Sequence, residues 1–197
     1  MKLTIFKYII ILSISLVLFG CSLLPESNTP VVTIAPPEKN SIQFTGKGAG
    51  AGMMLMSSMG PMGMAVGVAI DVGIGKDIHE TAVAGGVDFV EILQSHLQQT
   101  LNSAPRHGII SLDIKIEKYG FKTEPGENDP CVVDVELSYS INGGQWQTIT
   151  SESIYSSSPD LRALIKPFEL FKRSPVAIER AFTLFAEDFT IFLLSYR

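Results

Sequence analysis

The fold of the C-terminal half of this chain is decided by one stretch, Val133-Asp134-Val135-Glu136-Leu137-Ser138-Tyr139-Ser140-Ile141-Asn142-Gly143-Gly144. Apolar and polar residues alternate over its first nine positions, which is the pattern of a strand with one buried face. Its last three residues are a strong hairpin signal, and residues 145–151, around Trp146, supply the returning strand. Upstream, residues 110–117 alternate in the same way. The sequence therefore predicts a three-stranded antiparallel meander with one apolar face.

Helical patterns lie on both sides of these strands. Asp77 and Glu80 fit a capping box, and the apolar spacing that follows predicts one helix from Asp77 that ends at Ala104-Pro105. Near the C-terminus, Ser174-Pro175 is a good helix start, and an apolar stripe follows at helical spacing: Ile178, Phe182, Phe185, Phe189, Phe192 and Tyr196. The predicted fold class is α+β, in the order helix, three-stranded antiparallel meander, C-terminal helix packed on one sheet face.

Residues 46–76 have an unusual composition. Nine of the seventeen glycines and six of the seven methionines lie between positions 46 and 75, and no charged residue occurs from Gly48 to Ile70. Gly48 and Gly52 are four residues apart, as are Gly63 and Gly67, so each pair would form a small flat patch for close helix contact. The segment looks like the glycine-zipper segments of some envelope proteins.

Two arrangements of this segment remain open. One continuous helix over the charge-free residues would reach about 34 Å, enough to span the hydrocarbon of a bilayer. Gly60-Pro61 would break such a helix, and two short helical arms that turn there fit equally well. Methionine side chains adapt to irregular surfaces, which favours packing against protein, and glycine is costly in an isolated helix. We therefore rank a protein-facing contact surface, with Met56 and the four glycines as candidate residues, ahead of insertion into the membrane.

The N-terminus predicts export. Lys2 and Lys7 precede an apolar core from Tyr8 to Phe19 that is short for a membrane span, as in a secretory signal. The core ends in Leu18-Phe19-Gly20-Cys21, which resembles the lipobox of bacterial lipoproteins. The resemblance implies that residues 1–20 are removed and that Cys21 is lipidated. Ser22 after that cysteine, where an aspartate would retain the protein at the inner membrane, implies the periplasmic face of the outer membrane. An ordinary signal peptide or an uncleaved anchor helix is the alternative.

Charge and cysteine content exclude several classes of function. Loss of Lys2 and Lys7 with the signal lowers the formal net charge by two, from −5 to −7, and no Lys/Arg cluster is present. Such a chain is a poor candidate for binding nucleic acid or anionic lipid headgroups. With Cys21 lipidated, Cys131 has no partner for an internal disulfide. We interpret Cys131 as a buried thiol in a strand, with an intermolecular disulfide as the alternative.

No catalytic motif is complete. Gly46-Lys47-Gly48-Ala49-Gly50-Ala51 matches a dinucleotide fingerprint, and Asp71 lies at the distance of a ribose-binding acid, but we expect no stable helix after it. His79-Glu80 lacks the second histidine of a zinc protease motif, since position 83 is Val. Asp113, Glu117, Asp134 and Glu136 alternate with core positions and are interpreted as a solvated strand face. We therefore predict no enzyme activity, no cofactor and no metal.

These observations divide the chain into a signal peptide (1–20), a lipidated N-terminus and Pro-rich tether (21–45), a Gly/Met-rich segment (46–76) and a periplasmic α+β domain (77–197). Within the tether, residues 31–34 could pair briefly as a strand. The element order is similar to the small periplasmic domains of several accessory envelope lipoproteins, without a shared motif. The prediction is an accessory or scaffold lipoprotein that binds another envelope protein. The alternative is a membrane-inserting or oligomerising component, in which copies of the chain could form a homo-oligomer through the glycine faces. An enzyme without a visible motif ranks third.

Overall fold

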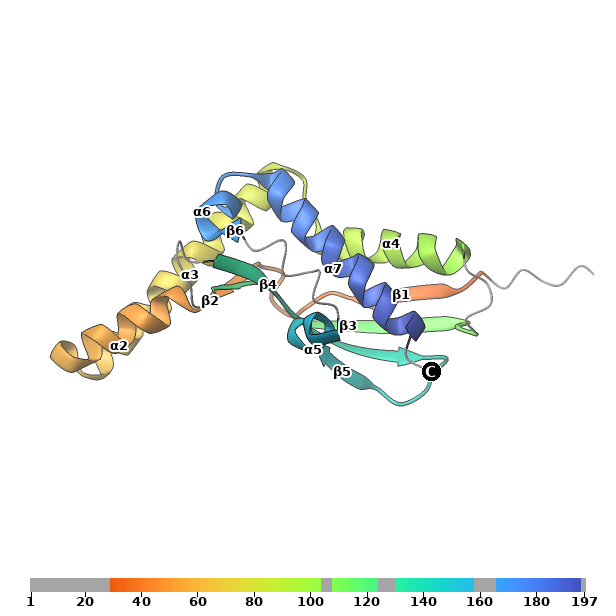
Figure 1. Ribbon diagram of the computed structural model, residues 1–197, viewed down its shortest axis with the longest axis horizontal. Helices are drawn as coiled ribbons and strands as arrows, with labels where there is room; N and C mark the ends of the chain where they lie inside the picture. Colours follow the sequence, from red (N-terminus) through yellow and green to blue (C-terminus); the bar gives the residue numbers. More distant parts are fainter. Residues whose placement is uncertain (1–28, 104–107, 124–129, 158–165, 196–197) are drawn as a thin grey trace, which may run out of the picture.

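The computed structural model describes residues 29–103, 108–123, 130–157 and 166–195. These residues form six helices and six strands in one mixed α/β arrangement (Figure 1). The strands are β1 (Val31–Ala35), β2 (Gln43–Thr45), β3 (Ser111–Thr123), β4 (Pro130–Ile141), β5 (Gln147–Thr150) and β6 (Lys166–Pro167). The helices are α2 (Lys47–Met59), α3 (Pro61–Ala84), α4 (Phe89–Ser103), α5 (Ser151–Ser157), α6 (Phe168–Phe171) and α7 (Pro175–Ser195).

The sheet differs from the predicted one. β3, β4 and β5 are antiparallel neighbours, but β1 and β2 both pair in parallel with β3, and β6 pairs with β4. The predicted three-stranded antiparallel meander is therefore not confirmed, because the sheet has six strands and mixed directions. β1 and β2 come from the segment predicted as a tether. Their short apolar runs are stabilised by pairing with a long strand that is remote in sequence.

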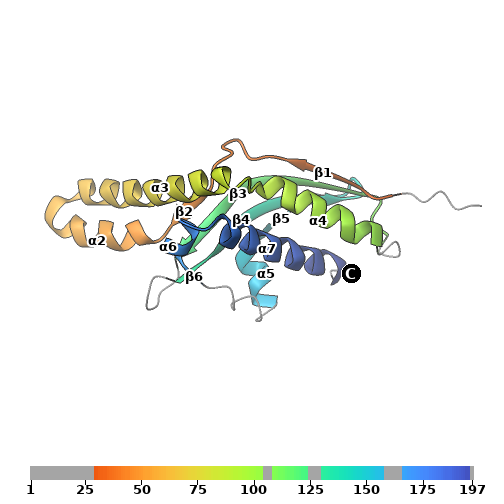
Figure 2. The ribbon, with the colours of Figure 1, turned by 90° about the horizontal axis from the view of Figure 1, so that it is seen from above.

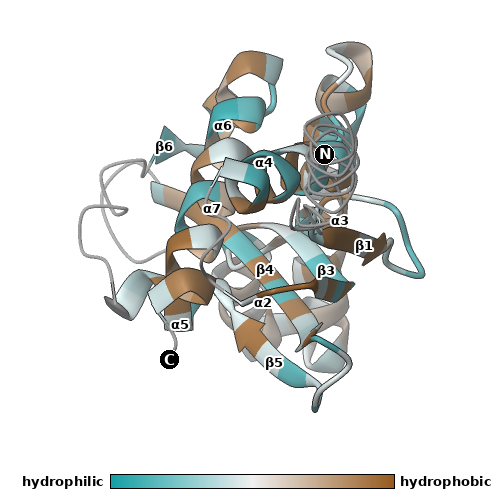
Figure 3. Cartoon of the chain, turned by 90° about the vertical axis from the view of Figure 1, so that its right-hand side faces the viewer, coloured by the Kyte–Doolittle hydropathy of each residue, from teal (hydrophilic) through white to brown (hydrophobic). Residues whose placement is uncertain are grey.

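The core lies between one face of the sheet and helices α4 and α7 (Figure 1). The stripe on α7 is buried as predicted at Ile178, Phe182, Phe185 and Phe189, while Tyr196 lies outside the described residues. Phe89 of α4 packs against Phe182, with ring centroids 4.9 Å apart. Hydrophobic and hydrophilic residues alternate along the central strands (Figure 3). The opposite sheet face is polar and carries the ion pairs Lys118–Asp134 (3.1 Å) and Lys115–Glu117 (3.0 Å).

The predicted helix from Asp77 is wrong at its start. Asp77 lies inside α3, which ends at Ala84, and Gly85-Gly86 separates α3 from α4. The N-terminus of α4 is capped by Asp88 instead, whose Oδ1 accepts hydrogen bonds from the backbone N–H groups of Val90 (2.8 Å) and Glu91 (3.2 Å). Asp77 pairs with Lys172 at 3.0 Å. The helix boundary lies at Gly85-Gly86 and not at the capping box, because Gly86 adopts a positive φ of 69°, which ends the helix.

α2 and the first half of α3 form a helical hairpin that extends away from the sheet, while the second half of α3 packs on the domain (Figures 1 and 2). Ile74, Ile78 and Ala82 of that second half are buried. Gly75 allows β2 to approach α3 closely, since a Cβ there would lie 3.0 Å from the carbonyl oxygen of Ile42. The hairpin is thus a projection of the same chain that builds the domain core.

Candidate functional site

Four glycines form the seam between the two arms of the hairpin. Gly48 and Gly52 of α2 and Gly63 and Gly67 of α3 are the only buried residues between positions 48 and 70. A Cβ on Gly48 would collide with the carbonyl oxygen of Gly67, and one on Gly63 would lie 2.5 Å from the backbone of Leu55 and Met56. The spacing of small residues therefore serves close helix contact, as predicted, but the contact lies inside one chain.

Asp71 fastens the base of the hairpin. Its Oδ1 accepts a hydrogen bond from the N–H of Gly48 at 2.6 Å, and its Oδ2 accepts one from the N–H of Gly46 at 3.0 Å. Gly46 has no side chain to cap α2, so a carboxylate from α3 satisfies the free N–H groups at this helix N-terminus. Sequence reasoning missed this role, although Gly63, Gly67 and Asp71 recur at intervals of four residues and therefore share one helix face.

A second contact holds the base of α2 to the domain. The ammonium of Lys47 lies 4.6 Å from the centroid of the Phe168 ring, which in turn packs on Phe44 at 5.8 Å. Lys47 and Asp71, the two charged residues that border the charge-free stretch in the sequence, therefore both lie at the base of the hairpin. From this level to the turn at Gly60, the hairpin contains no charged side chain.

The outer surface of the hairpin is apolar. Met54 is 80% exposed and Met62 is 67% exposed, and Met56, the one candidate contact residue that is not a glycine, is 53% exposed. The exposed apolar residues of the two arms are Met53, Met54, Met56, Met59, Met62, Met64, Val68, Ile70 and Val72. With about 3.6 residues per turn, they lie on both sides of the glycine seam as well as opposite it. Any surrounding molecule therefore meets methionine and aliphatic side chains and not the four glycines of the seam.

The only polar side chains between positions 48 and 70 are two serines near the turn. The hydroxyl of Ser57 donates a hydrogen bond to the carbonyl oxygen of Met54 at 2.8 Å, and that of Ser58 donates to Leu55 at 3.2 Å. At the turn, the N–H of Gly60 donates to the carbonyl of Met56, and Pro61 has no N–H to satisfy. Most polar groups of the arms are therefore bonded within the hairpin.

The dinucleotide fingerprint has a structural explanation. A helix does follow Gly46-Lys47-Gly48 directly, so the expectation that none would form there is wrong; packing on α3 offsets the low helix propensity of the glycines. However, the anion position at the N-terminus of α2 holds the Asp71 carboxylate. Asp71 therefore fills the place of a pyrophosphate, which its charge would repel.

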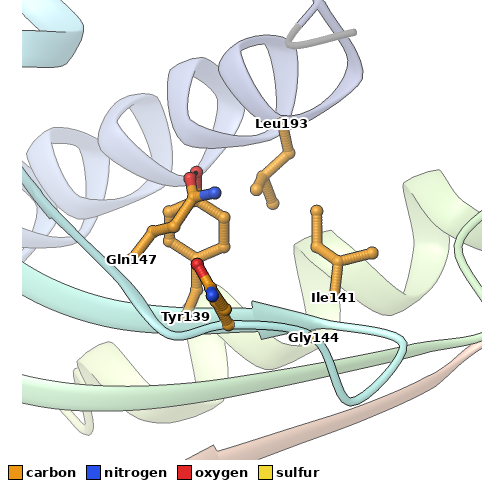
Figure 4. Close-up of a pocket in the computed structure, with 6 residues that line it drawn as sticks. Tyr139, Ile141, Gly144, Gln147 and Leu193 are labelled. Carbon is orange, nitrogen blue, oxygen red and sulfur yellow. Dashed lines mark hydrogen bonds between the residues drawn. The ribbon is translucent and has the colours of Figure 1, made fainter.

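The remaining candidate residues do not assemble into a catalytic site. No group of three or more His, Cys, Asp or Glu among the described residues could hold a metal ion. Glu117 is exposed, and the hydrogen bond from Lys115 lowers the pKa of its carboxyl. A cavity of about 250 Å³ lies between the β4–β5 turn and the C-terminal end of α7, next to Tyr139, Ile141 and Leu193 (Figure 4). The Tyr139 hydroxyl there donates to Gln147 at 2.7 Å.

Burial raises the pKa values of several side chains, among them Cys131 and Asp188. Cys131 is fully buried in β4, as interpreted from the sequence, and burial raises the pKa of its thiol to about 12. Asp188 on α7 was not anticipated: burial, and secondarily the charge of Glu187, raise the pKa of its carboxyl to about 6. Its Oδ2 has no hydrogen-bond partner.

Comparison of the chain with models of protein families, with curated proteins and with solved structures finds no match. Within the part of the chain that the structure describes, no helix is long and apolar enough to cross a membrane. The predicted signal peptide and Cys21 lie outside the described residues. The hairpin is therefore the feature on which a functional proposal rests.

Proposed function

We infer that this protein is a non-enzymatic accessory lipoprotein of the bacterial cell envelope, anchored through Cys21 at the periplasmic face of the outer membrane, and that its α2–α3 hairpin is embedded in lipid. The observation that carries the proposal is the charge-free surface of the hairpin, which is apolar around both arms. The sequence pattern ranks a protein partner first; the exposure of apolar side chains around both arms supports lipid as the first candidate instead.

The distribution of exposed apolar residues supports a lipid environment. A protein partner covers one face of a hairpin, whereas lipid surrounds it, and exposed apolar side chains occur on several faces of both arms. An apolar surface of this extent on a soluble protein marks a protein or membrane contact. Burial of such side chains contributes about 25 cal/mol per Å² of apolar area removed from water.

The hydrogen bonding of the arms also supports it. Within hydrocarbon, every polar group must be satisfied by the protein itself, which favours helices. Both serines of the hairpin donate to their own helix. The glycine cost that argued against insertion is offset, because the glycines allow the two arms to pack against each other.

A protein partner is the second candidate function, and the abundance of methionine favours it. Methionine is flexible and polarisable, and it is common at surfaces that adapt to partners. Six exposed methionines on one projection would suit another envelope protein or a second copy of this chain. In that case the outer methionine surfaces, and not the buried glycines, would make the contact.

Membrane extraction of a lipid-free protein separates the two candidates. Residues 1–21 are replaced by a cleavable export signal without a lipidation cysteine, and the cells are fractionated with carbonate. Retention of the protein in the membrane pellet supports the lipid-embedded hairpin, and release as a soluble protein contradicts it and moves the protein partner into first place.

A charged variant tests whether the hairpin itself causes retention. Replacement of Met54 and Met62 by Glu places carboxylates at exposed positions that make no core contact, so the fold should survive while the cost of burying charge in lipid blocks insertion. The matched control is Val176→Glu, because Val176 is 71% exposed on the domain. We expect the double variant to be released and the control to be retained.

A further inference from the structure

The chain enters the described structure at the end of the molecule opposite to the hairpin (Figures 1 and 2). Pro30 is fixed there, since its carbonyl oxygen accepts a hydrogen bond from Nε2 of Gln98 at 2.7 Å. Val31 next to it pairs with Ser111, at the start of β3. The hairpin begins after Thr45, which pairs with Lys122 near the other end of the same strand.

The length of the molecule between these points follows from the strand register. Ser111 and Lys122 are eleven residues apart on β3, which corresponds to about 36 Å at 3.3 Å per residue. α2 has thirteen residues and adds about 20 Å beyond that point. The hairpin turn at Gly60 is therefore about 56 Å from Pro30 along the long axis.

The chain that precedes Pro30 has a matching length. Nine peptide steps separate Cys21 from Pro30, and they can reach at most about 31 Å when fully extended. If Cys21 sits at a membrane surface, Pro30 can stand about 31 Å above it. With the hairpin pointing towards the membrane, its base lies about 36 Å below Pro30, which is about 5 Å more than this reach. A tilt of the molecule by about 30° shortens that height to about 31 Å and brings the base to the headgroups.

We propose that the hairpin enters the same membrane that holds the lipid on Cys21, and that the stretch from Cys21 to Pro30 is just long enough to allow it. This rests on the proposed function, because it requires both a lipidated Cys21 and a lipid-embedded hairpin. The Lys47 and Asp71 level then lies at the headgroups. At that tilt the arms reach about 17 Å below this level, less than the hydrocarbon thickness of about 30 Å, and return to the same side.

The matching lengths make the depth of the hairpin sensitive to the chain before Pro30. Deletion of residues 25–28 would reduce the reach to about 17 Å. The base of the hairpin would then stand about 19 Å above the membrane in an upright molecule, and only the turn would touch the headgroups. Even a tilt of about 60°, which brings the base to within about 1 Å of the surface, would leave the turn only about 9 Å below it, about half of its depth in the full-length protein.

The test uses the lipidated protein in vesicles of phosphatidylethanolamine and phosphatidylglycerol. A Met62→Cys variant carries an environment-sensitive fluorophore at the hairpin turn, and quencher groups placed at known depths on the lipid chains report its position. Cys131 does not compete for the label because it is fully buried. The shortened protein is compared with two controls: the same four residues replaced by glycine and serine, and a duplication of residues 25–28.

We expect quenching by lipid in both controls and at least a twofold loss of quenching in the shortened protein. Equal quenching in all three proteins would overturn the shared-membrane proposal while leaving the lipid-embedded hairpin intact. An absence of lipid quenching in all three would contradict the proposed function itself. The lipid-free protein separates the cases further, because its hairpin should insert to the same depth with or without residues 25–28.

Discussion

Replacement of Gly67 by Ala is the sharpest perturbation of the hairpin. A Cβ at position 67 would collide with the carbonyl oxygen of Gly48 and would lie 3.0 Å from the Cα of Gly52. Both neighbours are backbone atoms of the opposite arm, so the two helices must move apart. Gly50→Ala is a matched control, because a Cβ at position 50 has no other atom within 4 Å.

The expected magnitude follows from two opposing effects. Alanine is favoured over glycine in a helix interior by about 0.8–1 kcal/mol, and this gain applies at both positions. Forcing an additional methyl group into a close contact costs about 1–3 kcal/mol, and this cost applies only at position 67. The free energies of hairpin opening of the two variants should therefore differ by about 1–3 kcal/mol, with Gly50→Ala the more stable.

Amide hydrogen exchange measures this difference directly. In the lipid-free protein, the amides of α2 and of residues 61–70 should exchange about 5–150-fold faster in Gly67→Ala than in Gly50→Ala, as a difference of 1–3 kcal/mol implies. The amides of α4 and β4 serve as an internal reference and should not change. Equal protection of the hairpin in the two variants would refute the role of the glycines as a seam within the chain.

Three further predictions concern individual side chains. Asp71→Ala removes both acceptors for the Gly46 and Gly48 N–H groups and should destabilise α2 by about 1–2 kcal/mol, seen as faster exchange of the first α2 amides; unchanged exchange would contradict the cap. The pKa of Asp188 is raised in the folded protein, to about 6, so its charged form destabilises the fold; this penalty is absent below about pH 4 and complete above pH 6. Asp188→Asn should therefore raise the free energy of unfolding by about 1–2 kcal/mol at pH 8 and change it little at pH 4, as urea titrations would measure; an equal effect at both pH values would count against this cause. The Cys131 thiol, with its pKa raised to about 12, should not react with a thiol reagent at pH 8 until the protein unfolds, and rapid labelling of the native protein would show that it is accessible.

The parts of the fold that sequence reasoning anticipated are those with strong local periodicity. The alternation in β3 and β4 and the aromatic stripe on α7 each identify one buried face, and burial follows them. The parallel strands β1 and β2 were not placed in the sheet, because each has five residues or fewer and depends on pairing with β3. Such pairing between remote segments has no local signal, so the sheet order could not be derived from spacing alone.

The hairpin shows a different limit. The four-residue spacing of Gly48 with Gly52 and of Gly63 with Gly67 correctly indicated close helix contact, but it did not specify which helices meet. The spacing of Asp71 matches that of a ribose-binding acid, whereas its partner in the structure is the N-terminus of α2. Asp77 was assigned as a cap although the helix boundary lies at Gly85-Gly86, because a capping box is also compatible with a helix interior. In each case the residue type indicates the kind of contact, but the sequence does not indicate which segment provides the partner.

The depth of a probe at the hairpin turn shows whether the hairpin lies in lipid. Lipid-free protein with a fluorophore at Met62→Cys is mixed with vesicles that contain lipids quenching at known depths, and Lys115→Cys on the polar sheet face is the reference position. A hairpin embedded in lipid gives a blue-shifted emission that lipid quenches at position 62, and an aqueous spectrum at position 115. An aqueous, unquenched probe at position 62 would contradict the claim and point to a protein partner for the methionine surface.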